Sequence, residues 1–384
     1  MGHAVAQSDA ARMSFTGRHL TVDWIDAHRS VYDAIWLWDN SAGHRNPSNG
    51  QRLIDATDLP TDPLIEAVDS QAKVLVIRWA GSDLISQYDL GWLRNNCYCR
   101  LEPAPGGKQV VLWRAAEAPW LTRVDANEVW QSEQVRHTWL TAVALQGIAF
   151  LKRAPAREGI VLELARLVGF VRETNYGRVF NVRTLPDPNN LAYSNKGLAL
   201  HTDNPYREPV PGLQMLHCIS SSDTGVDSTF ADGFAVADSL RCDEPDSFSI
   251  LSQVPVRFSF RDRTADLSSA RPLIQLDLHG RLEAIHYNSR SIAPLRLPPS
   301  DMVPFYRAYR SFARRLHTPE FLFQTRLEIG DVVLFDNRRV LHGRTEFSPA
   351  ANRHLQGCYL DRDGLFSNIA VLERSLETQG RWTS

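Results

Sequence analysis

The sequence has no hydrophobic run long enough to span a membrane, and it has little net charge. A membrane helix needs about 20 consecutive apolar residues, whereas this 384-residue chain has an ordinary 43% of hydrophobic and 22% of charged residues. Lys and Arg number 42 and Asp and Glu 44, which gives a net charge of −2. Nucleic acids and anionic membranes attract strongly basic proteins. We therefore expect neither a membrane protein nor a nucleic-acid-binding protein.

Cysteine is scarce as well, and its spacing excludes a disulfide scaffold. The five cysteines are an odd number and follow no framework spacing: Cys97, Cys99, Cys218, Cys242 and Cys358. Residues 1–17 lack the charged-then-apolar order of a secretory signal, and we expect a short disordered start there. Reduced thiols and the missing signal are typical of a cytoplasmic protein.

The hydrophobic pattern predicts two domains. Short alternating segments at 19–24, 34–38 and 73–79 predict strands, so we expect a small N-terminal β-rich domain at 18–101. A turn-rich segment begins a linker at 102–118. The remainder, 119–384, mixes predicted helices with predicted strands; the helices are expected at 128–143, 157–173, 234–240 and 303–315, and the strands at 212–219, 228–233 and 332–335.

His201, Asp203 and His342 are the residues that indicate chemistry. Two imidazoles and one carboxylate form the facial triad of non-haem Fe(II) oxygenases, which leaves metal positions open for a co-substrate and O2. His201 and Asp203 are two residues apart, so on a strand they share a face. A buried strand at 332–335 would lead to His342 through a loop. Taken alone, His342 is more often a structural histidine than a metal ligand, but the three residues in this order predict an Fe(II) site.

Strands that are distant in the sequence must meet around such a metal. That arrangement is typical of a double-stranded β-helix, or jelly roll, with helices bracing one sheet. Downstream, Arg353 could bind a carboxylate with two parallel hydrogen bonds, as 2-oxoglutarate requires. An isolated arginine there would be an ordinary ion-pair residue. Together with the triad it predicts 2-oxoglutarate and O2 as co-substrates.

The chain resembles the γ-butyrobetaine dioxygenases, within the taurine dioxygenase-like group of Fe(II)/2-oxoglutarate enzymes. The matching stretches are 189–193, 200–203, 211–218, 232–234, 335–344 and 353–359. The resemblance implies a mostly β catalytic domain of the jelly-roll type, a small N-terminal domain and a homodimer. It also implies that His201, Asp203 and His342 bind iron, and that Arg353, assisted by Ser228, holds 2-oxoglutarate.

The N-terminal domain departs from the family pattern. Segment 36–40 matches the family's opening strand, after which members usually carry a cysteine-rich zinc knuckle, whereas this chain has Ser41-Ala42-Gly43-His44. Cys97 and Cys99 could still form a zinc site with His44, since zinc accepts thiolate and imidazole ligands. Two partly exposed thiols are the alternative that we favour. We therefore expect no structural zinc.

The resemblance also implies an aromatic cage for a quaternary ammonium group, which cannot donate hydrogen bonds and is attracted to ring faces. The matching positions are Tyr176, Phe180, Tyr193 and Tyr359, with Asn190 beside them. Aromatic residues at such positions are also typical of a hydrophobic core. Tyr193 and Tyr359 lie a few residues from predicted metal or 2-oxoglutarate residues, which favours the cage.

Segment 286–291 matches the family's substrate loop and contains Asn288 and Arg290. A guanidinium offers more donors than one carboxylate needs and suits a phosphonate; the alternative is a solvated or ion-paired arginine. The resemblance therefore favours hydroxylation of 2-(trimethylammonio)ethylphosphonate at C1, the carbon that bears phosphorus. Hydroxylation of γ-butyrobetaine to carnitine is the second interpretation. A non-catalytic, metal-free binding module is the third.

Overall fold

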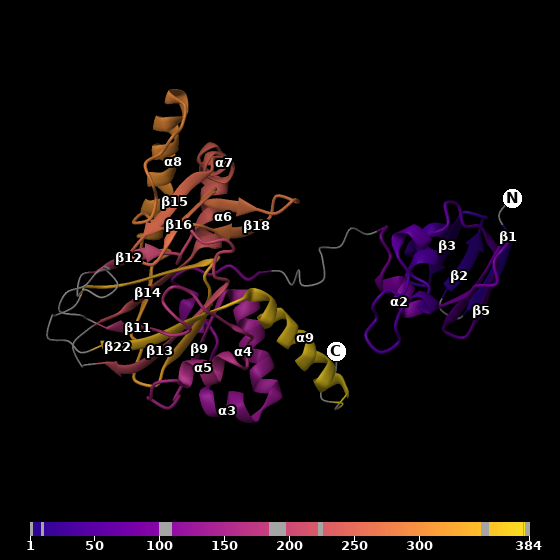
Figure 1. Cartoon of the computed structure of the whole chain (residues 1–384), viewed down its shortest axis with the longest axis horizontal. Coiled ribbons are helices and arrows are strands. Elements are labelled where there is room, and N and C mark those ends of the chain that lie inside the picture. The colour runs from indigo at the N-terminus through magenta and orange to yellow at the C-terminus, as the bar shows by residue number, and fades with distance from the viewer. Residues whose placement is uncertain are drawn as a thin grey trace. The chain divides into compact units, whose positions relative to one another are not determined.

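The computed structural model describes residues 3–8, 11–99, 110–183, 197–221, 226–346, 353–378 and 380. The chain forms two compact units, Met1–Pro105 and Gly106–Ser384 (Figure 1). Each unit has its own hydrophobic core. None of the helices in the described ranges is both long and apolar enough to cross a membrane.

The first unit contains two antiparallel sheets with short helices. Their strand orders are β1-β2-β3-β4 and β5-β6-β7. Alternate side chains of both sheets, among them Leu20, Val22, Leu75 and Ile77, are buried in one core. The elements are β1 (His3–Ser8), β2 (Ala11–Phe15), β3 (His19–Trp24), β4 (Arg29–Asp33), α1 (Ala34–Asp39), η1 (Ala42–His44), η2 (Ala56–Asp58), β5 (Ile65–Gln71), β6 (Val74–Trp79), β7 (Ile85–Asp89) and α2 (Leu90–Asn95).

Two sequence-based expectations for this unit are wrong. Residues 11–15 of the expected disordered start form strand β2, because Ala11 and Met13 alternate with more exposed neighbours and so bury one face of the strand. Segment 34–38, expected as a strand, lies in helix α1. There the Trp36 ring stacks on Tyr32 and also contacts Trp92. Tertiary aromatic packing thus overrides the local alternation that predicted a strand.

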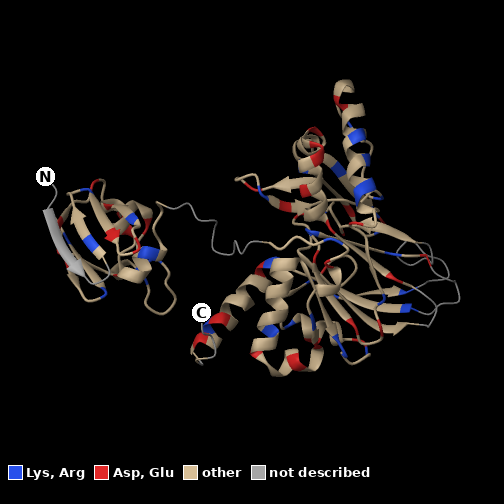
Figure 2. Ribbon diagram, turned by 180° about the vertical axis from the view of Figure 1, so that it is seen from behind, with Lys and Arg blue, Asp and Glu red and all other residues tan. Residues whose placement is uncertain are grey.

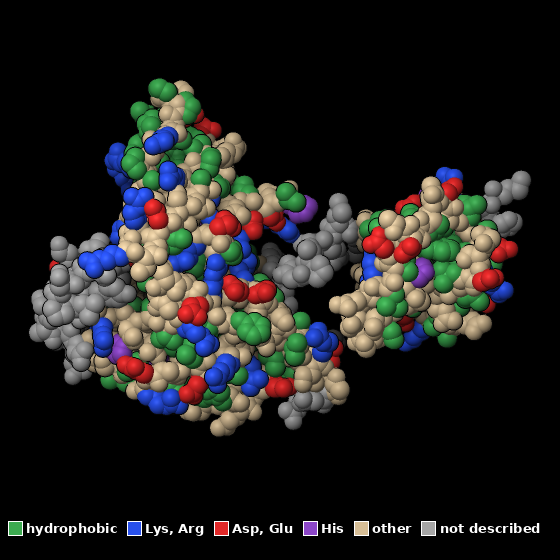
Figure 3. Space-filling model, in the orientation of Figure 1, with side chains coloured by type: hydrophobic (Ala, Val, Ile, Leu, Met, Phe, Trp, Pro, Cys, Tyr) green, Lys and Arg blue, Asp and Glu red, His purple; other side chains and the backbone are tan. Residues whose placement is uncertain are grey.

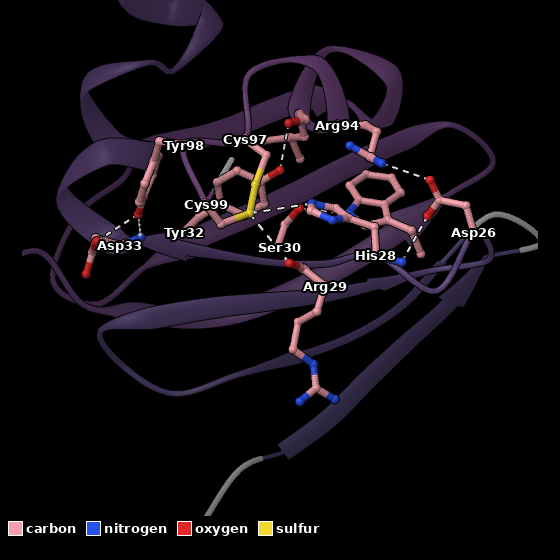
Figure 4. The surroundings of a disulfide bond; sticks show 12 residues. Asp26, His28, Arg29, Ser30, Tyr32, Asp33, Arg94, Cys97, Tyr98 and Cys99 are labelled. Atoms are coloured by element: carbon pink, nitrogen blue, oxygen red, sulfur yellow. Dashed lines mark hydrogen bonds and ion pairs between the residues drawn. A yellow bond between two sulfur atoms is a disulfide. The ribbon is translucent and has the colours of Figure 1, made fainter. Parts of the chain in front are cut away.

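The expectation of two free thiols at the end of this unit is also wrong. Cys97 and Cys99 form a disulfide (Figure 4). The segment that carries them leaves α2 in a turn, which brings two side chains at positions i and i+2 together. The expected partner His44 lies elsewhere, with its Nδ1 2.9 Å from the carbonyl oxygen of Trp38. Cys218 and Cys358 are free and buried, and Cys242 is free and exposed.

The second unit is a β-sandwich. Among its described strands, the larger sheet has the order β10-β22-β13-β20-β9-β8, with β11 also paired to β22, and the smaller has the order β12-β21-β14-β19. Apolar side chains from both sheets, including Phe150, Leu216, Phe230 and Phe335, share one core. The strands of the two sheets are β8 (Arg123–Asp125), β9 (Ile148–Lys152), β10 (Val171–Arg172), β11 (Phe180–Arg183), β12 (Leu198–His201), β13 (Leu213–Ser221), β14 (Ser228–Asp232), β19 (Phe323–Thr325), β20 (Val332–Asp336), β21 (Val340–Arg344) and β22 (Arg353–Leu360).

Apart from β8 and β9, strands that are neighbours in the two sheets do not follow one another in the sequence. Among the described strands of these sheets, all pairings are antiparallel except that of β8 with β9. The predicted jelly roll is therefore confirmed. Helices cover the outer face of the larger sheet (Figure 1) and share a core with it; they are α3 (Ala126–Gln131), α4 (Glu133–Gln146), α5 (Ile160–Ala165) and α9 (Arg362–Thr378).

A second helical layer packs on two hairpins that are inserted between β14 and β19. Its elements are α6 (Gly233–Asp243), α7 (Pro245–Gln253), α8 (Pro299–Leu316), β15 (Val256–Arg261), β16 (Asp266–Arg271), β17 (Ile274–Leu276) and β18 (Leu282–Ile285). Basic residues recur along α8 (Figure 2). One of them, Arg315, pairs with Asp243 at 2.8 Å and Glu244 at 3.0 Å and so joins α8 to α6 and α7. Hydrophobic side chains gather near the other end of α8 (Figure 3), where Val303 and Tyr306 are exposed.

The expected linker at 102–118 is too long. Residues 100–109 lie outside the described ranges, but residues 110–118 lead into η3 (Ala118–Trp120) and belong to the second unit. Trp113 is buried there, and its indole nitrogen donates to the carbonyl of Gln146 at 2.8 Å.

The helix expected at 128–143 is interrupted at Ser132, whose hydroxyl accepts from the backbone N–H of Val135 and caps α4.

Candidate active site

Two histidines from distant segments lie side by side on neighbouring strands of the smaller sheet. His201 is the last residue of β12, and it pairs directly with His342 on β21. Their ring centroids are 4.3 Å apart. His342 thus lies within a strand, not in a loop as the sequence suggested. The antiparallel register places the two imidazoles side by side, although they are 141 positions apart in the sequence.

Asp203 completes the cluster from the bend that follows β12. It is not on the strand, so the expected strand-face geometry is wrong for this residue. Its carboxylate oxygens lie 3.2 Å from Nε2 of His201 and 3.7 Å from Nε2 of His342. The buried Asn337 fixes this bend, because its amide accepts from the backbone N–H of Asp203 at 2.7 Å and donates to the Asp203 carbonyl at 3.0 Å.

The three side chains fit one metal ion. One donor atom from each of His201, Asp203 and His342 lies within 4.8 Å of the other two. Nδ1 of His201 lies 2.9 Å from the Ala199 carbonyl, which can only accept, so this nitrogen carries the proton and Nε2 keeps its lone pair for a metal. Two neutral imidazoles and a carboxylate are the ligands of the Fe(II) facial triad.

Burial and charge set the protonation of these groups. Burial raises the pKa of Asp203, but the neighbouring His342 and His201 and a hydrogen bond from Tyr359 outweigh that effect and lower it below the ordinary value. Burial, reinforced by His201, lowers the pKa of His342 to about 3. The carboxylate is therefore ionised and His342 neutral near neutral pH, as metal binding requires.

Two buried arginines lie in the same cavity as the triad. Arg353 begins β22 and donates to the hydroxyl of Ser228 on β14 at 2.7 Å. No carboxylate within the described ranges forms a salt bridge with Arg353. Burial lowers the pKa of Arg353 to about 10. The pKa of the neighbouring Arg344 is also lowered to about 10, mainly by burial and in addition by the charges of Arg353 and Arg290. Both therefore stay charged at neutral pH, and together they form a cationic pocket that suits a carboxylate.

The cavity measures about 350 Å³, in the range of small-molecule sites. Its wall includes the triad, both buried arginines and Ser228. It also includes five residues predicted to contact substrate: Tyr176, Phe180, Asn288, Arg290 and Tyr359. The remaining two, Asn190 and Tyr193, lie outside the described residues. The structure thus brings every described candidate residue into one cavity.

Aromatic rings cover one part of the wall. Phe180 on β11 and Tyr359 on β22 lie with centroids 4.9 Å apart. Tyr206 stacks on Phe260 of β15 at 5.2 Å, and Tyr176 meets the edge of that ring at 6.0 Å. The sequence analysis missed Tyr206 and Phe260. Tyr206 could have been noticed because it follows Asp203 by three residues, but nothing local to Phe260 connects it with the site.

The loop with Asn288 and Arg290 closes another side of the cavity. The Asn288 side chain donates to the carbonyl of Thr202 at 3.1 Å and accepts from the backbone N–H of Arg290 at 3.2 Å. It thereby ties this loop to the triad segment. Arg290 lines the cavity but is exposed, so it lies on an open side. Partial burial lowers the pKa of Arg290 overall, although the charge of Asp203 and two tyrosines act to raise it.

Comparison with known proteins agrees with this site. The family model for the taurine catabolism dioxygenase TauD, TfdA family matches residues 106–359. A γ-butyrobetaine dioxygenase of Pseudomonas sp. (strain AK-1) is 37% identical over 92% of this chain and 94% of its own. The human γ-butyrobetaine dioxygenase is 31% identical over 94% of this chain and 96% of its own. The mitochondrial trimethyllysine dioxygenase of Bos taurus is 30% identical over 89% of this chain and 82% of its own.

Solved structures show more distant similarity. An asparagine oxygenase in complex with Fe(II), 3-hydroxyasparagine and succinate is 17% identical, covers 67% of this chain and 88% of its own, and has a TM-score of 0.48. AAD-2 in complex with Mn(II) and N-oxalylglycine is 16% identical, covers 60% and 89%, and has a TM-score of 0.49. The family match and the sequence relatives establish that this chain belongs to the TauD/TfdA family and is an Fe(II)- and 2-oxoglutarate-dependent dioxygenase.

Proposed function

We propose that this dioxygenase hydroxylates a small zwitterion that carries a trimethylammonium group at one end and a phosphonate at the other, namely 2-(trimethylammonio)ethylphosphonate at C1. One observation carries the proposal: Arg290 lines the same cavity as the triad and the aromatic rings. The cavity therefore offers a surface for a quaternary cation and a separate donor group for an anion.

Separate groups of residues bind the metal and the co-substrate. His201, Asp203 and His342 hold Fe(II), which together with 2-oxoglutarate and O2 supplies the oxidising power to convert a C–H bond into C–OH. Arg353, with Ser228 and Arg344 beside it, orients the distal carboxylate of 2-oxoglutarate.

The aromatic rings of Tyr176, Phe180, Tyr206, Phe260 and Tyr359 hold the trimethylammonium group, because ring faces attract a cation that cannot donate hydrogen bonds. They also exclude water from the cavity. Holding the cation at a fixed place decides which C–H bond faces the metal.

The place of Arg290 favours a phosphonate. In 2-(trimethylammonio)ethylphosphonate and in γ-butyrobetaine alike, one methylene separates the nitrogen from the carbon to be hydroxylated. In the phosphonate, phosphorus is bonded directly to the carbon that is hydroxylated. In γ-butyrobetaine, a further methylene separates the hydroxylated carbon from the carboxylate. An anion that must lie beside the reacting carbon needs a cation near the metal ligands. Arg290 meets that need, since it lines the same cavity as His201, Asp203 and His342.

γ-Butyrobetaine hydroxylation is the second candidate. It is favoured by the similarity to γ-butyrobetaine dioxygenases along nearly the whole chain. Both candidates belong to the same reaction class, hydroxylation of a small trimethylammonium compound. The third interpretation, a metal-free binding module, is disfavoured by the three metal-donor atoms that meet in one cavity.

Succinate formation with Fe(II), 2-oxoglutarate and O2 tests the proposal when the two substrates are compared side by side. We expect a higher kcat/KM for the phosphonate, with the product hydroxylated next to phosphorus. Arg290→Gln should raise the KM for the phosphonate by about 10- to 100-fold, since a lost charged hydrogen bond costs about 1.5–3 kcal/mol. Arg263→Gln, at an exposed position, is the matched control.

Two results would contradict the phosphonate assignment. One is a higher kcat/KM for γ-butyrobetaine in the unmodified enzyme. The other is an Arg290→Gln enzyme whose KM for the phosphonate is unchanged. A stoichiometric Fe(II) titration separates both outcomes from the binding-module interpretation, which requires that no iron binds.

A further inference from the structure

A second group of metal-donor side chains lies in the first unit (Figure 4). It consists of His28, which follows the turn after β3, and of Cys97 and Cys99 beyond α2. The cysteine sulfur of Cys99 lies 3.5 Å from Nε2 of His28. One donor atom from each residue lies within 4.8 Å of the other two. The fold thus assembles two cysteine sulfurs, joined in a disulfide, and one imidazole from segments about 70 residues apart.

The neighbouring contacts hold these segments in place. Tyr98, between the two cysteines, donates to Oδ2 of Asp33 at 2.7 Å and accepts from the backbone N–H of Asp33 at 2.7 Å. The backbone N–H of His28 donates to Asp26 at 3.1 Å, and Asp26 also accepts from Arg94 at 2.8 Å. Figure 4 shows both anchors on either side of the cysteines. Both segments therefore have contacts that do not depend on the disulfide.

The spacing matches that of a zinc site. Zn–S bonds of about 2.3 Å and Zn–N bonds of about 2.0 Å in a tetrahedron give an N···S separation of about 3.6 Å and an S···S separation of about 3.8 Å. The His28–Cys99 distance of 3.5 Å already has the first value. The two sulfurs, which the disulfide bonds to each other, must separate to reach the second value. Zinc sites with three protein ligands complete their coordination with water.

We propose that His28, Cys97 and Cys99 form a redox-controlled site for a borderline-soft divalent cation such as Zn²⁺, and that the disulfide is its closed state. Opening the site takes two electrons and two protons from a dithiol, which is itself oxidised to a disulfide. Zn²⁺ then displaces the two thiol protons and binds two thiolates and Nε2 of His28. Cys99 is exposed, so a small dithiol can reach its sulfur.

This site differs from the catalytic one in its ligands and hence in the metals that it selects. Thiolates favour zinc and other soft cations, whereas the carboxylate and imidazoles of the catalytic triad suit Fe(II) and Mn(II). It also differs from the arrangement considered from the sequence, because His44 bonds to the Trp38 carbonyl and His28 takes its place.

The site would stabilise the first unit in a way that the disulfide cannot. The disulfide joins residues only two positions apart, so it hardly restricts the unfolded chain. A metal that joins His28 to Cys97 and Cys99 would close a loop of about 70 residues and would bind the folded state only. We therefore expect the cation to raise the unfolding temperature of the reduced protein.

Cobalt(II) is the probe that tests the site in the full-length protein. Thiolate ligands give Co²⁺ a near-ultraviolet charge-transfer band, and the catalytic triad, which has no thiolate, cannot produce it. We expect about one equivalent of Co²⁺ to produce this band in protein reduced with a dithiol, and Zn²⁺ to abolish it by competition. Protein with the disulfide intact should show no band.

Matched variants decide which residues bind. Cys97→Ser and Cys99→Ser should each abolish the band, and His28→Gln should weaken Co²⁺ binding at least about 10-fold. Cys242→Ser and His44→Gln should leave it unchanged. The proposal is overturned if reduced protein gives no band, if the band survives loss of either cysteine, or if His28→Gln binds Co²⁺ as tightly as the unmodified protein.

Circular dichroism of each variant shows whether it folds. A rise in unfolding temperature with Zn²⁺, present in the reduced protein and absent from Cys99→Ser, is the second expected readout. A folded Cys99→Ser protein that gains the same thermal stability from Zn²⁺ would also overturn the proposal. Because neither readout involves turnover, the result is independent of the substrate proposed above.

Discussion

The hydroxyl of Tyr359 donates a hydrogen bond of 2.8 Å to Oδ2 of Asp203. The ring of the same residue packs against Phe180. Tyr359 was expected only as part of an aromatic cage, yet its polar end orients a candidate metal ligand. A carboxylate held in this way keeps one oxygen hydrogen-bonded, so that the other is free for the metal.

Tyr359→Phe separates these two roles, because it removes the hydrogen bond and keeps the ring. We expect kcat and the apparent affinity for Fe(II) to fall about 10- to 100-fold, the usual effect of losing such a partner. The KM for the trimethylammonium substrate should change little. Steady-state kinetics at several Fe(II) concentrations measure this, with Tyr306→Phe on α8 as control. A raised KM with unchanged kcat would mean that the hydroxyl serves substrate binding instead.

Asn337 is expected to be essential for the shape of the site. Asn337→Ala leaves the buried backbone groups of Asp203 and the Pro211 carbonyl without their partner. Each such group costs about 1–3 kcal/mol, so the free energy of unfolding should fall by at least that amount. Denaturant unfolding measures it, and Asn49→Ala in an exposed loop is the control. Equal stability of Asn337→Ala and the unmodified protein would refute the role of this amide.

Arg353→Lys keeps the positive charge but removes the planar guanidinium, whose parallel N–H groups can donate two hydrogen bonds to one carboxylate. We expect the KM for 2-oxoglutarate to rise about 10- to 100-fold, because one charged hydrogen bond contributes about 1.5–3 kcal/mol. Ser228→Ala should have a smaller effect in the same direction, since it removes only the hydroxyl beside Arg353. The exposed Arg314→Lys is the control. An unchanged KM in Arg353→Lys would place 2-oxoglutarate elsewhere.

Metal binding at the triad should stabilise the fold. At a free Mn²⁺ concentration of 100 times its dissociation constant, linkage predicts a gain of about 2.7 kcal/mol in the free energy of unfolding. Asp203→Ala should abolish the gain, and a chelator should reverse it in the unmodified protein. Thermal unfolding with and without Mn²⁺ measures the change. If Asp203→Ala gains as much stability as the unmodified protein, the triad is not the Mn²⁺ site.

Much of the catalytic unit was predictable because its signals are local. Strands β13, β14 and β20 and helices α6 and α8 lie close to the expected ranges, and in the first unit strand β3 has the expected bounds. The triad residues and Arg353 were found because few side chains suit iron and a carboxylate. Cytoplasmic location and homodimer assembly stay predictions.

Other features of the site were not readable from the sequence. Phe260 reaches the catalytic cavity from an inserted hairpin. In the first unit, His28 approaches Cys99 from the connection between β3 and β4. Asn337 carried no signal of its role, because its partners lie more than 120 positions away.

By itself, the sequence determined the chemistry of this protein, because ligand types and their order along the chain restrict the metal and the co-substrate. Only the tertiary structure decided where those groups meet. Strand register sets His201 against His342, and long-range contacts place Tyr359 on Asp203 and His28 on Cys99. Such contacts depend on the packing of whole sheets, and no short segment of the sequence encodes them.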